Sequence, residues 1–318
     1  MSDQDPGITR HRRGRGFSYR APDGTTIARG RERERIEALA VPPAYENVWI
    51  CSRPDGHLQA TGRDARRRKQ YRYHPKWSEV QAENKFEFLA HFGEMVPRIR
   101  RRIDRDLQAH SGDEVFALAA AVLLIDRASL RVGHPANVRE NGSYGALTLR
   151  QRHLSLDDDK IHLRFTAKGG AKVRKTITDR KLLRLLHKVN DIPGATLLTW
   201  LDDDGAPQTI SSQKLNSYLA DAAGSEQATA KTFRTWAGTL AAFECAAQGG
   251  ATITAMAQAA ADRLHNTPTV ARNSYIHPAV IDLADIKLDD IEHVTEARSQ
   301  VSGLFVAEQR MLPLLQTR

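Results

Sequence analysis

The sequence predicts an α+β protein of two domains. A small, β-rich N-terminal domain should occupy residues 1–80, and a larger, mainly α-helical domain with a small three-stranded antiparallel sheet should occupy residues 81–318. A length of 318 residues suffices for two ordinary domains. Short β-forming runs separated by turn residues fill the chain up to Trp77, and from Glu83 onward most apolar residues recur at helical spacing.

The N-terminal domain should fold from about Gly16 onward, after a basic, disordered tail over residues 1–16. Residues 32–40 predict a short charged helix. Pro42 and Pro43 end it, because proline has no N–H group to continue a helical hydrogen-bond ladder.

Two strands and a basic segment follow this helix. Residues 48–51 and 57–61 flank a Pro-Asp-Gly turn and predict a β-hairpin. Residues 63–74 interleave cations with amide and phenol groups, and a period of two would place Tyr71 and Tyr73 on one side of a strand. A solvated edge strand is the alternative interpretation of this segment.

Positive charge is concentrated at the front of the chain. Of the net charge of +9, residues 1–80 contribute +7, with 17 Lys and Arg against 10 Asp and Glu, whereas residues 281–318 hold 7 acids against 4 bases. This distribution indicates a polyanionic partner. Arg and Lys suit phosphates, while Gln and Tyr reach bases, sugars or backbone oxygens, so the candidate contacts are Arg63, Arg67, Lys69, Gln70, Tyr71 and Tyr73.

The larger domain alternates helices with one group of strands. Ser111 and Glu114 predict a capping box before a nearly all-apolar core helix. The predicted helices cover residues 85–92, 95–108, 115–130, 179–190, 211–223, 229–248 and 252–264. The predicted strands cover residues 145–150, 160–167 and 172–178.

Three polar residues stand at places where these elements end. Arg131 emerges from the apolar helix just before Gly133, where it either pairs with a buried acid or points into a site. Lys168 lies in a hairpin turn, as a solvated cation or as a mobile one able to enter a site. Tyr275 ends a helix that Thr267 and Pro268 begin as N-cap and first residue.

Several classes of protein are excluded by the sequence. No stretch approaches the ~20 apolar residues of a membrane span, and no apolar signal core is visible, so we expect a cytoplasmic protein without a membrane partner. Cys51 and Cys245 lie far apart without metal-ligand spacing. Glycine-rich phosphate loops and acidic clusters are absent, and we expect no cofactor, no metal and no nucleotide.

The chain resembles a known family. Arg131, Lys168, Arg234 in Lys-Thr-Phe-Arg-Thr-Trp, and Tyr275 after Asn-Thr-Pro-Thr match, in order and spacing, the catalytic set of type IB DNA topoisomerases of the small poxvirus-like and bacterial form. The likeness extends over roughly residues 40 to 280.

The resemblance implies a fold, a partner and a reaction. The fold would be a C-shaped clamp whose larger domain has the tyrosine recombinase and topoisomerase IB catalytic fold, closing as a monomer around double-stranded DNA in the nucleoid. Tyr275 would form a 3′-phosphotyrosyl link, the nicked strand would rotate, and religation would relax the supercoil without ATP or metal. Arg131 and Arg234 would stabilise charge on the phosphate, and Lys168 would protonate the leaving oxygen.

One residue departs from the poxvirus-like pattern. Asn266 stands where those enzymes place a histidine, and His265 precedes it. We favour Asn266 in this role, because a shift of one residue turns a helical side chain by about 100°. A tyrosine recombinase and a non-catalytic DNA-binding clamp remain the alternative functions.

Overall fold

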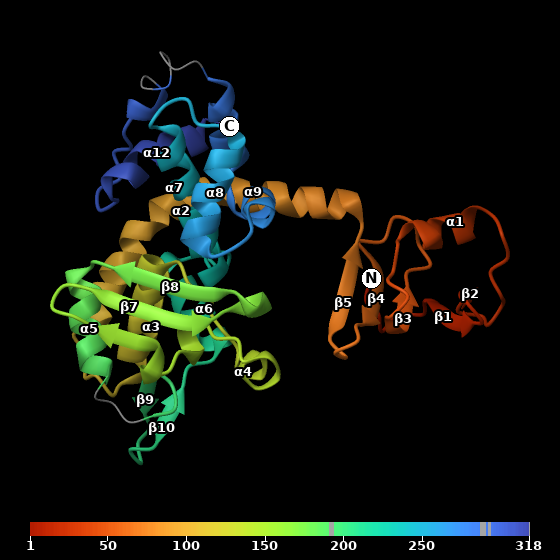
Figure 1. Ribbon diagram of the computed structural model, residues 1–318, viewed down its shortest axis with the longest axis horizontal. Helices are drawn as coiled ribbons and strands as arrows, with labels where there is room; N and C mark the ends of the chain where they lie inside the picture. The colour runs from red at the N-terminus through yellow and green to blue at the C-terminus, as the bar shows by residue number, and fades with distance from the viewer. Residues whose placement is uncertain (191–193, 287–290, 292–293, 318) are drawn as a thin grey trace. The chain divides into compact units, whose positions relative to one another are not determined.

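The computed structural model describes residues 1–190, 194–286, 291 and 294–317. The chain divides into two compact units, Met1–Lys85 and Phe86–Arg318, a few residues beyond the predicted boundary (Figure 1). Each unit has its own hydrophobic core.

The smaller unit is built on an antiparallel sheet with the strand order β2-β1-β3-β4-β5. Helix α1 (Arg31–Ala38) contributes Ile36 to its core. The predicted hairpin is confirmed as β3 and β4, and β5 is the edge strand, on which the Tyr71 and Tyr73 rings stack with centroids 6.1 Å apart. The strands are β1 (Ile8–Arg13), β2 (Gly16–Arg20), β3 (Glu46–Ile50), β4 (Leu58–Arg63) and β5 (Lys69–Tyr73).

The predicted disorder of residues 1–16 is wrong for β1. Ile8 is buried, and residues 9–13 pair with β2. Arg10 donates hydrogen bonds to the carbonyl oxygens of Val41, Pro42 and Tyr45. The basic composition suggested a solvated tail, but one buried isoleucine and the partners of Arg10 give this segment a place in the sheet.

Helix α2 (Pro75–Asp106) is one helix of 32 residues where the sequence predicted two. Its first turns belong to the smaller unit and the remainder to the larger one. Pro97 lies inside it, at the cost of a helical hydrogen bond. Val96 and Pro97 are both buried in the core, and this packing favours a continuous helix over a break.

The larger unit is organised around α3 (Glu114–Ala128), which is apolar on nearly all sides and contacts α5, α6, α7 and β8. The predicted capping box is wrong, because Asp113 rather than Ser111 is the N-cap, and its carboxylate accepts from the His110 N–H. The other helices are α4 (Pro135–Asn141), α5 (Arg180–Asn190), α6 (Ser212–Ala223), α7 (Ala230–Ala246), α8 (Ile253–Leu264), α9 (Pro268–Tyr275), α10 (Pro278–Ile281) and α12 (Val306–Gln316). Short 3-10 turns cover Ala146–Thr148, Gln151–His153, Lys168–Gly170 and Asp282–Asp285.

A three-stranded antiparallel sheet of order β6-β7-β8 packs against α3, as Figure 1 shows. Strands β7 (Ile161–Thr166) and β8 (Lys172–Ile177) were predicted, but the strand predicted at 145–150 is wrong and the third strand is β6 (Leu154–Leu156). Thr148 Oγ1 accepts the Gly145 N–H, which closes that segment into a 3-10 turn. A small hairpin, β9 (Thr199–Leu201) and β10 (Pro207–Thr209), was not predicted.

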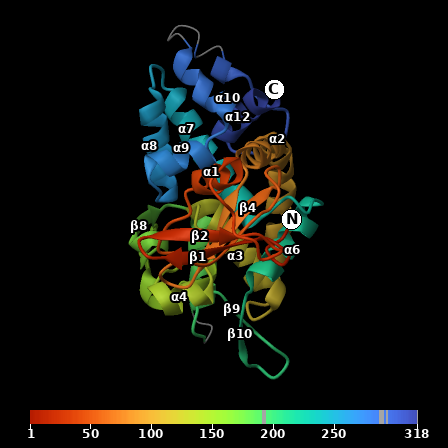
Figure 2. The same cartoon turned by 90° about the vertical axis from the view of Figure 1, so that its right-hand side faces the viewer.

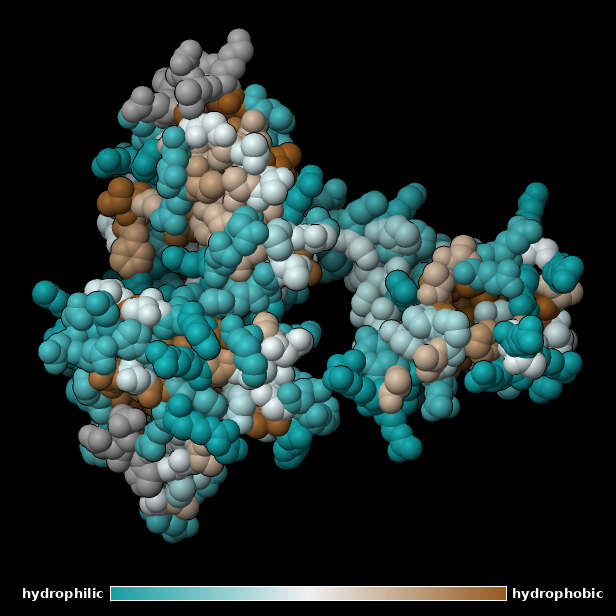
Figure 3. All heavy atoms as spheres, viewed as in Figure 1, coloured by the Kyte–Doolittle hydropathy of each residue, from teal (hydrophilic) through white to brown (hydrophobic). Residues whose placement is uncertain are grey.

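Helices α7, α8 and α9 lie side by side (Figure 2). Within the acidic stretch at 282–296, residues 287–290 and 292–293 lie outside the described residues. Hydrophilic side chains cover most of the face seen in Figure 3. Among the described residues, none of the helices is both long and apolar enough to cross a bilayer.

Candidate active site

Two helices of the larger unit end in left-handed turns that carry candidate residues. Ser129 (φ 54°) follows α3, and His265 (φ 51°) follows α8. Neither residue is a glycine, and the left-handed conformation costs a non-glycine residue roughly 1–2 kcal/mol. These turns send Arg131 and Asn266 away from their helices, and such local strain is a common property of functional sites.

Arg234 joins the two helix ends. It lies in α7, is 4% exposed, and donates to the Ser129 carbonyl oxygen and, at 3.0 Å, to the Leu264 carbonyl oxygen. Its guanidinium carbon lies 5.4 Å from the centroid of the Tyr275 ring. Burial, and then repulsion from Arg131, lower the pKa of Arg234 to about 10, so it is charged at neutral pH.

Arg131 donates a hydrogen bond to Asn266 Oδ1. Because an arginine can only donate, this contact leaves the amide nitrogen of Asn266 as the free end of the side chain. Asn266 Nδ2 and Arg234 Nε are buried without a hydrogen-bond partner in the described residues. Burial lowers the pKa of Arg131, and its attraction to Tyr275 opposes that change.

Tyr275 is the last residue of α9 and is half-buried. The helix begins as the sequence predicted, since Thr267 caps it by accepting the Val270 N–H at 3.3 Å and Pro268 follows. A Cβ atom at Gly238 in α7 would lie 2.8 Å from the Tyr275 carbonyl oxygen and 2.9 Å from its Cβ. Only a glycine at 238 therefore lets α9 approach α7 this closely.

Lys168 stands apart from this group. It is exposed in the 3-10 turn between β7 and β8, next to Gly169 (φ 79°) and Gly170 (φ 82°). Across the described parts of the chain, its side chain makes no hydrogen bond or ion pair with the other four candidates. The structure thus brings together Arg131, Arg234, Asn266 and Tyr275 but not Lys168.

Lys175 was missed by the sequence analysis. It lies on β8 opposite the fully buried Leu163, and its ammonium donates to the Ala128 carbonyl oxygen at 2.8 Å and the Arg263 carbonyl oxygen at 3.0 Å. A signal was present, because the period of two that turns Val173 inward turns Lys175 to the same face. His265, whose pKa is lowered by burial and by the cations around it, also lies here with Nε2 buried and unpartnered in the described chain.

The N-terminal residues predicted to contact a polyanionic partner lie around a loop whose conformation is stabilised by hydrogen bonds to Asp64. This carboxylate accepts from the backbone N–H groups of Arg66 and Arg68 and from Gln70 Nε2 at 3.1 Å. Lys69 pairs with Asp3, a partner the sequence did not suggest.

The other N-terminal candidates remain accessible. Arg63 donates to the Arg67 carbonyl oxygen at 2.9 Å, and both arginines are exposed. Tyr71 and Tyr73 are 49% and 48% exposed.

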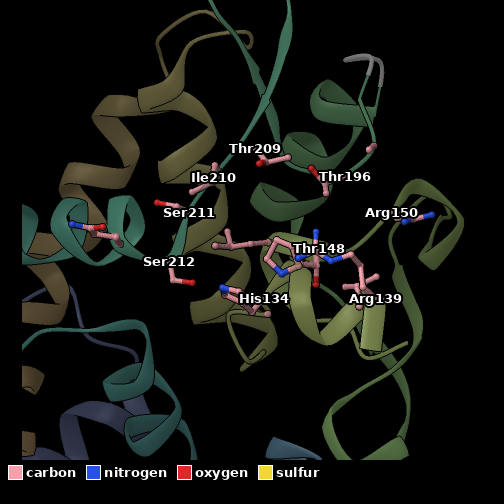
Figure 4. Close-up of a pocket in the computed structure, with 15 residues that line it drawn as sticks. His134, Arg139, Thr148, Arg150, Thr196, Thr209, Ile210, Ser211 and Ser212 are labelled. Atoms are coloured by element: carbon pink, nitrogen blue, oxygen red, sulfur yellow. The ribbon is translucent and has the colours of Figure 1, made fainter. Parts of the chain in front are cut away.

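A cavity of about 650 Å³ opens beside the start of α4 (Figure 4). Its lining includes His134, Arg139, Thr148, Arg150, Thr209 and Ser211, and none of the five catalytic candidates. Within the described residues, no group of three or more His, Cys, Asp or Glu side chains is placed to hold a metal ion. The group formed by Arg131, Arg234, Asn266 and Tyr275 is therefore a better candidate for the active site than the cavity.

Comparison with known families agrees with this architecture. Residues 74–274 match the family described as eukaryotic DNA topoisomerase I, catalytic core, and residues 16–64 match the N-terminal domain of bacterial DNA topoisomerase IB. The first match covers more than half of the chain, so the protein belongs to the type IB DNA topoisomerases. The catalytic fold of the larger domain and the enzyme class expected from the resemblance are confirmed.

Individual relatives point the same way. The chain is 29% identical over 238 residues to DNA topoisomerase 1B of Acanthamoeba polyphaga mimivirus, covering 74% of this chain and 70% of that protein. It is 25% identical over 172 residues to DNA topoisomerase 1B of vaccinia virus (strain Copenhagen), covering 54% of this chain and 51% of the viral protein. The catalytic-core match ends one residue before Tyr275.

Proposed function

We propose that this enzyme relaxes supercoiled duplex DNA by cutting one strand through Tyr275, letting the strand rotate, and resealing it, without ATP or metal. The observation that carries the proposal is the position of the Tyr275 ring 5.4 Å from the buried guanidinium of Arg234, beside the Arg131–Asn266 pair. A nucleophile, two cations and an amide donor thus share one site.

The cations suit a phosphodiester in its transition state. Arg131 and Arg234 offer planar N–H donors to the non-bridging oxygens, and the free Asn266 Nδ2 adds a neutral one. Fixed donors in a site of low dielectric stabilise developing charge strongly, because they need no reorganisation when the reaction occurs. Asn266, rather than His265, faces Arg131 and takes the role of the family histidine.

The chemistry conserves one diester bond at each step. The Tyr275 oxygen forms a bond to phosphorus while the bond from phosphorus to the 5′-oxygen breaks, which leaves a 3′-phosphotyrosyl link and a 5′-hydroxyl. Lys168 supplies the proton that this oxygen needs, and the glycines beside it let its turn move toward a bound phosphate. Attack by the 5′-hydroxyl reverses the step, so no ATP is consumed.

The N-terminal domain, residues 1–80, supplies the grip on the duplex in this proposal. Arg63, Arg67 and Lys69 contact phosphates, while Gln70, Tyr71 and Tyr73 reach bases, sugars or backbone oxygens. With the catalytic domain, residues 81–318, it closes around the DNA as a monomeric clamp in the cytoplasm, in association with the nucleoid.

Plasmid relaxation tests this function. Sub-stoichiometric wild-type protein should relax supercoiled plasmid in EDTA without ATP, and Tyr275→Phe should bind DNA but form no covalent adduct in a denaturing gel. Tyr144→Phe, which removes a different tyrosine hydroxyl, is the matched control and should relax the plasmid. Strand exchange between two duplexes would favour the recombinase alternative, and binding without cleavage would favour the non-catalytic clamp.

A further inference from the structure

Two cations bridge the C-terminal ends of α3 and α8 at successive residues. Lys175 donates to the carbonyl oxygens of Ala128 (2.8 Å) and Arg263 (3.0 Å). Arg234 donates to the carbonyl oxygens of the next residues on each helix, Ser129 and Leu264.

The Arg131–Asn266 hydrogen bond continues this series. Arg131 lies two residues beyond Ser129, and Asn266 lies two residues beyond Leu264. The two chain segments are therefore connected three times in sequence, by Lys175, by Arg234 and by the pair itself.

The half-buried position of Lys175 costs hydration free energy, which its hydrogen bonds to the two helix ends offset. A lysine on the inward face of a strand loses hydration, and burial is the first cause that lowers its pKa, to about 8. The last carbonyl groups of a helix have no helical partner, and the helix dipole makes the C-terminal end favourable for a cation. Two such ends converge on one ammonium group here.

We propose that Lys175 is a positioning residue for strand cleavage, which sets the distance between the ends of α3 and α8 and thereby holds Arg131 and Asn266 in place around the phosphate. The inference rests on the proposed function, because it assigns Lys175 to the same site. Lys175 does not touch the phosphate; it acts through the backbone that carries the residues that do.

Among the described residues, the charges that shift the pKa of Lys175 are cationic, whereas the carboxylate of Asp262 acts on His265. Arg263 on α8 and Arg234 on α7 repel the Lys175 ammonium, and the charge of Lys175 contributes to the lowered pKa of His265. As the pH rises past about 8, the ammonium becomes an amine that keeps two N–H donors but loses the charge that strengthens both bonds.

The test is single-turnover cleavage of a nicked-duplex trapping substrate by full-length wild type, Lys175→Met, Lys175→Arg and the control Lys160→Met. Methionine fills similar space but cannot donate, and Lys160 is an exposed lysine just before β7 of the same sheet. Lys175→Met should bind the DNA with wild-type affinity yet cleave it about 10- to 100-fold more slowly, the loss expected when reacting groups are misplaced by about 1 Å. Lys160→Met should match wild type.

The pH profile separates positioning from general stability. The ratio of the wild-type rate to the Lys175→Met rate should be largest at neutral pH and shrink above pH 8, because ionisations shared by both proteins cancel in the ratio. Lys175→Arg keeps the positive charge and can donate to both carbonyl oxygens, so it should cleave faster than Lys175→Met. The ratio of the Lys175→Arg rate to the Lys175→Met rate should not decline as the pH rises.

Three results would overturn the inference: wild-type cleavage by Lys175→Met, a ratio that is constant between about pH 6 and about pH 10, or the same high-pH decline in Lys175→Arg as in wild type. If Lys175→Met does not fold, the comparison of wild type with Lys175→Arg still decides. Failure of the wild type itself to form an adduct would instead refute the proposed function.

Discussion

The buried hydroxyl of Thr239 donates a hydrogen bond of 3.1 Å to the carbonyl oxygen of Tyr275. The same hydroxyl oxygen accepts the His277 N–H at 3.1 Å. Thr239 belongs to α7, which also carries Arg234, so one helix positions both Tyr275, the proposed nucleophile, and the cation beside it.

Thr239→Val tests whether the Thr239 hydroxyl positions Tyr275. Valine matches the shape of threonine but leaves a buried carbonyl and a buried N–H unpaired, which costs about 1–3 kcal/mol. We expect a lower unfolding midpoint and slower cleavage with unchanged DNA binding, whereas Thr239→Ser should retain both hydrogen bonds and most activity. Wild-type cleavage by Thr239→Val would show that the end of α9 is fixed by other contacts.

Asn266 and His265 can be distinguished by substitution. Asn266→Ala should slow cleavage by about 10²-fold, the size expected for loss of one oxyanion donor. Asn266→His should retain cleavage at mildly acidic pH, because an imidazole can donate the same bond, and His265→Ala should matter little. A loss of about 10²-fold in His265→Ala would place the donor one residue earlier than we propose.

The role proposed for Lys168 predicts that a change in the substrate restores cleavage by a Lys168 variant. Replacing the 5′-bridging oxygen by sulfur gives a thiolate leaving group with a pKa near ~8.5, which needs no proton. On that substrate Lys168→Ala should cleave close to the wild-type rate, while Arg131→Ala and Arg234→Ala should stay slow. Equal rescue of all three variants, or of none, would move the proton donor away from Lys168.

The DNA contacts proposed for the smaller unit predict how the binding affinity depends on salt. If Arg67 contacts a phosphate, Arg67→Ala should reduce the slope of log affinity against log salt by about 0.9. Arg53→Ala is the control, because Arg53 lies in the same unit but pairs with Asp55 on the surface. An unchanged slope in Arg67→Ala would assign the phosphate contacts to other cations.

A buried ion network predicts a stability difference. Arg100 pairs with Asp126 at 3.0 Å and Glu308 of α12 at 2.7 Å, and Glu308 also accepts from Trp236 at 2.9 Å. Glu308→Gln should lower the free energy of unfolding by an amount on the order of 3 kcal/mol, because it leaves a buried arginine undercompensated.

Urea unfolding measures this, with Glu114→Gln as the control. Glu114 pairs with Lys214 at the surface, where a salt bridge contributes only about 0–1 kcal/mol. Equal destabilisation by the two substitutions would mean that the network adds no more than a surface pair.

The features predicted correctly from the sequence depend on neighbours in the chain. Thr267 and Pro268 define the start of α9 by capping geometry alone, and the period of two in β7 distinguishes its buried face from its wet one. The same local logic indicated that Lys168 would lie in a turn between strands.

Some of the errors come from contacts between distant residues. Arg10 finds carbonyl partners more than 30 residues away, which no local pattern reveals, and Gly145, at the start of the segment at 145–150, packs closely against the backbone of Gly133. Lys175 was overlooked because a lysine in a strand is normally solvated, and its two acceptors belong to helices far from it in sequence.

The partners of Arg234 are neutral carbonyl oxygens, and this affects how the proposed site would bind a phosphate. Buried arginines are commonly paired with carboxylates, but within the described chain neither Arg131 nor Arg234 forms an ion pair with an acid. Neutral carbonyl oxygens accept hydrogen bonds from the Nη atoms of both arginines without cancelling the positive charge. In the proposed site, a DNA phosphate would therefore displace no carboxylate of the described residues, and the positive charge of both arginines would be available to attract it.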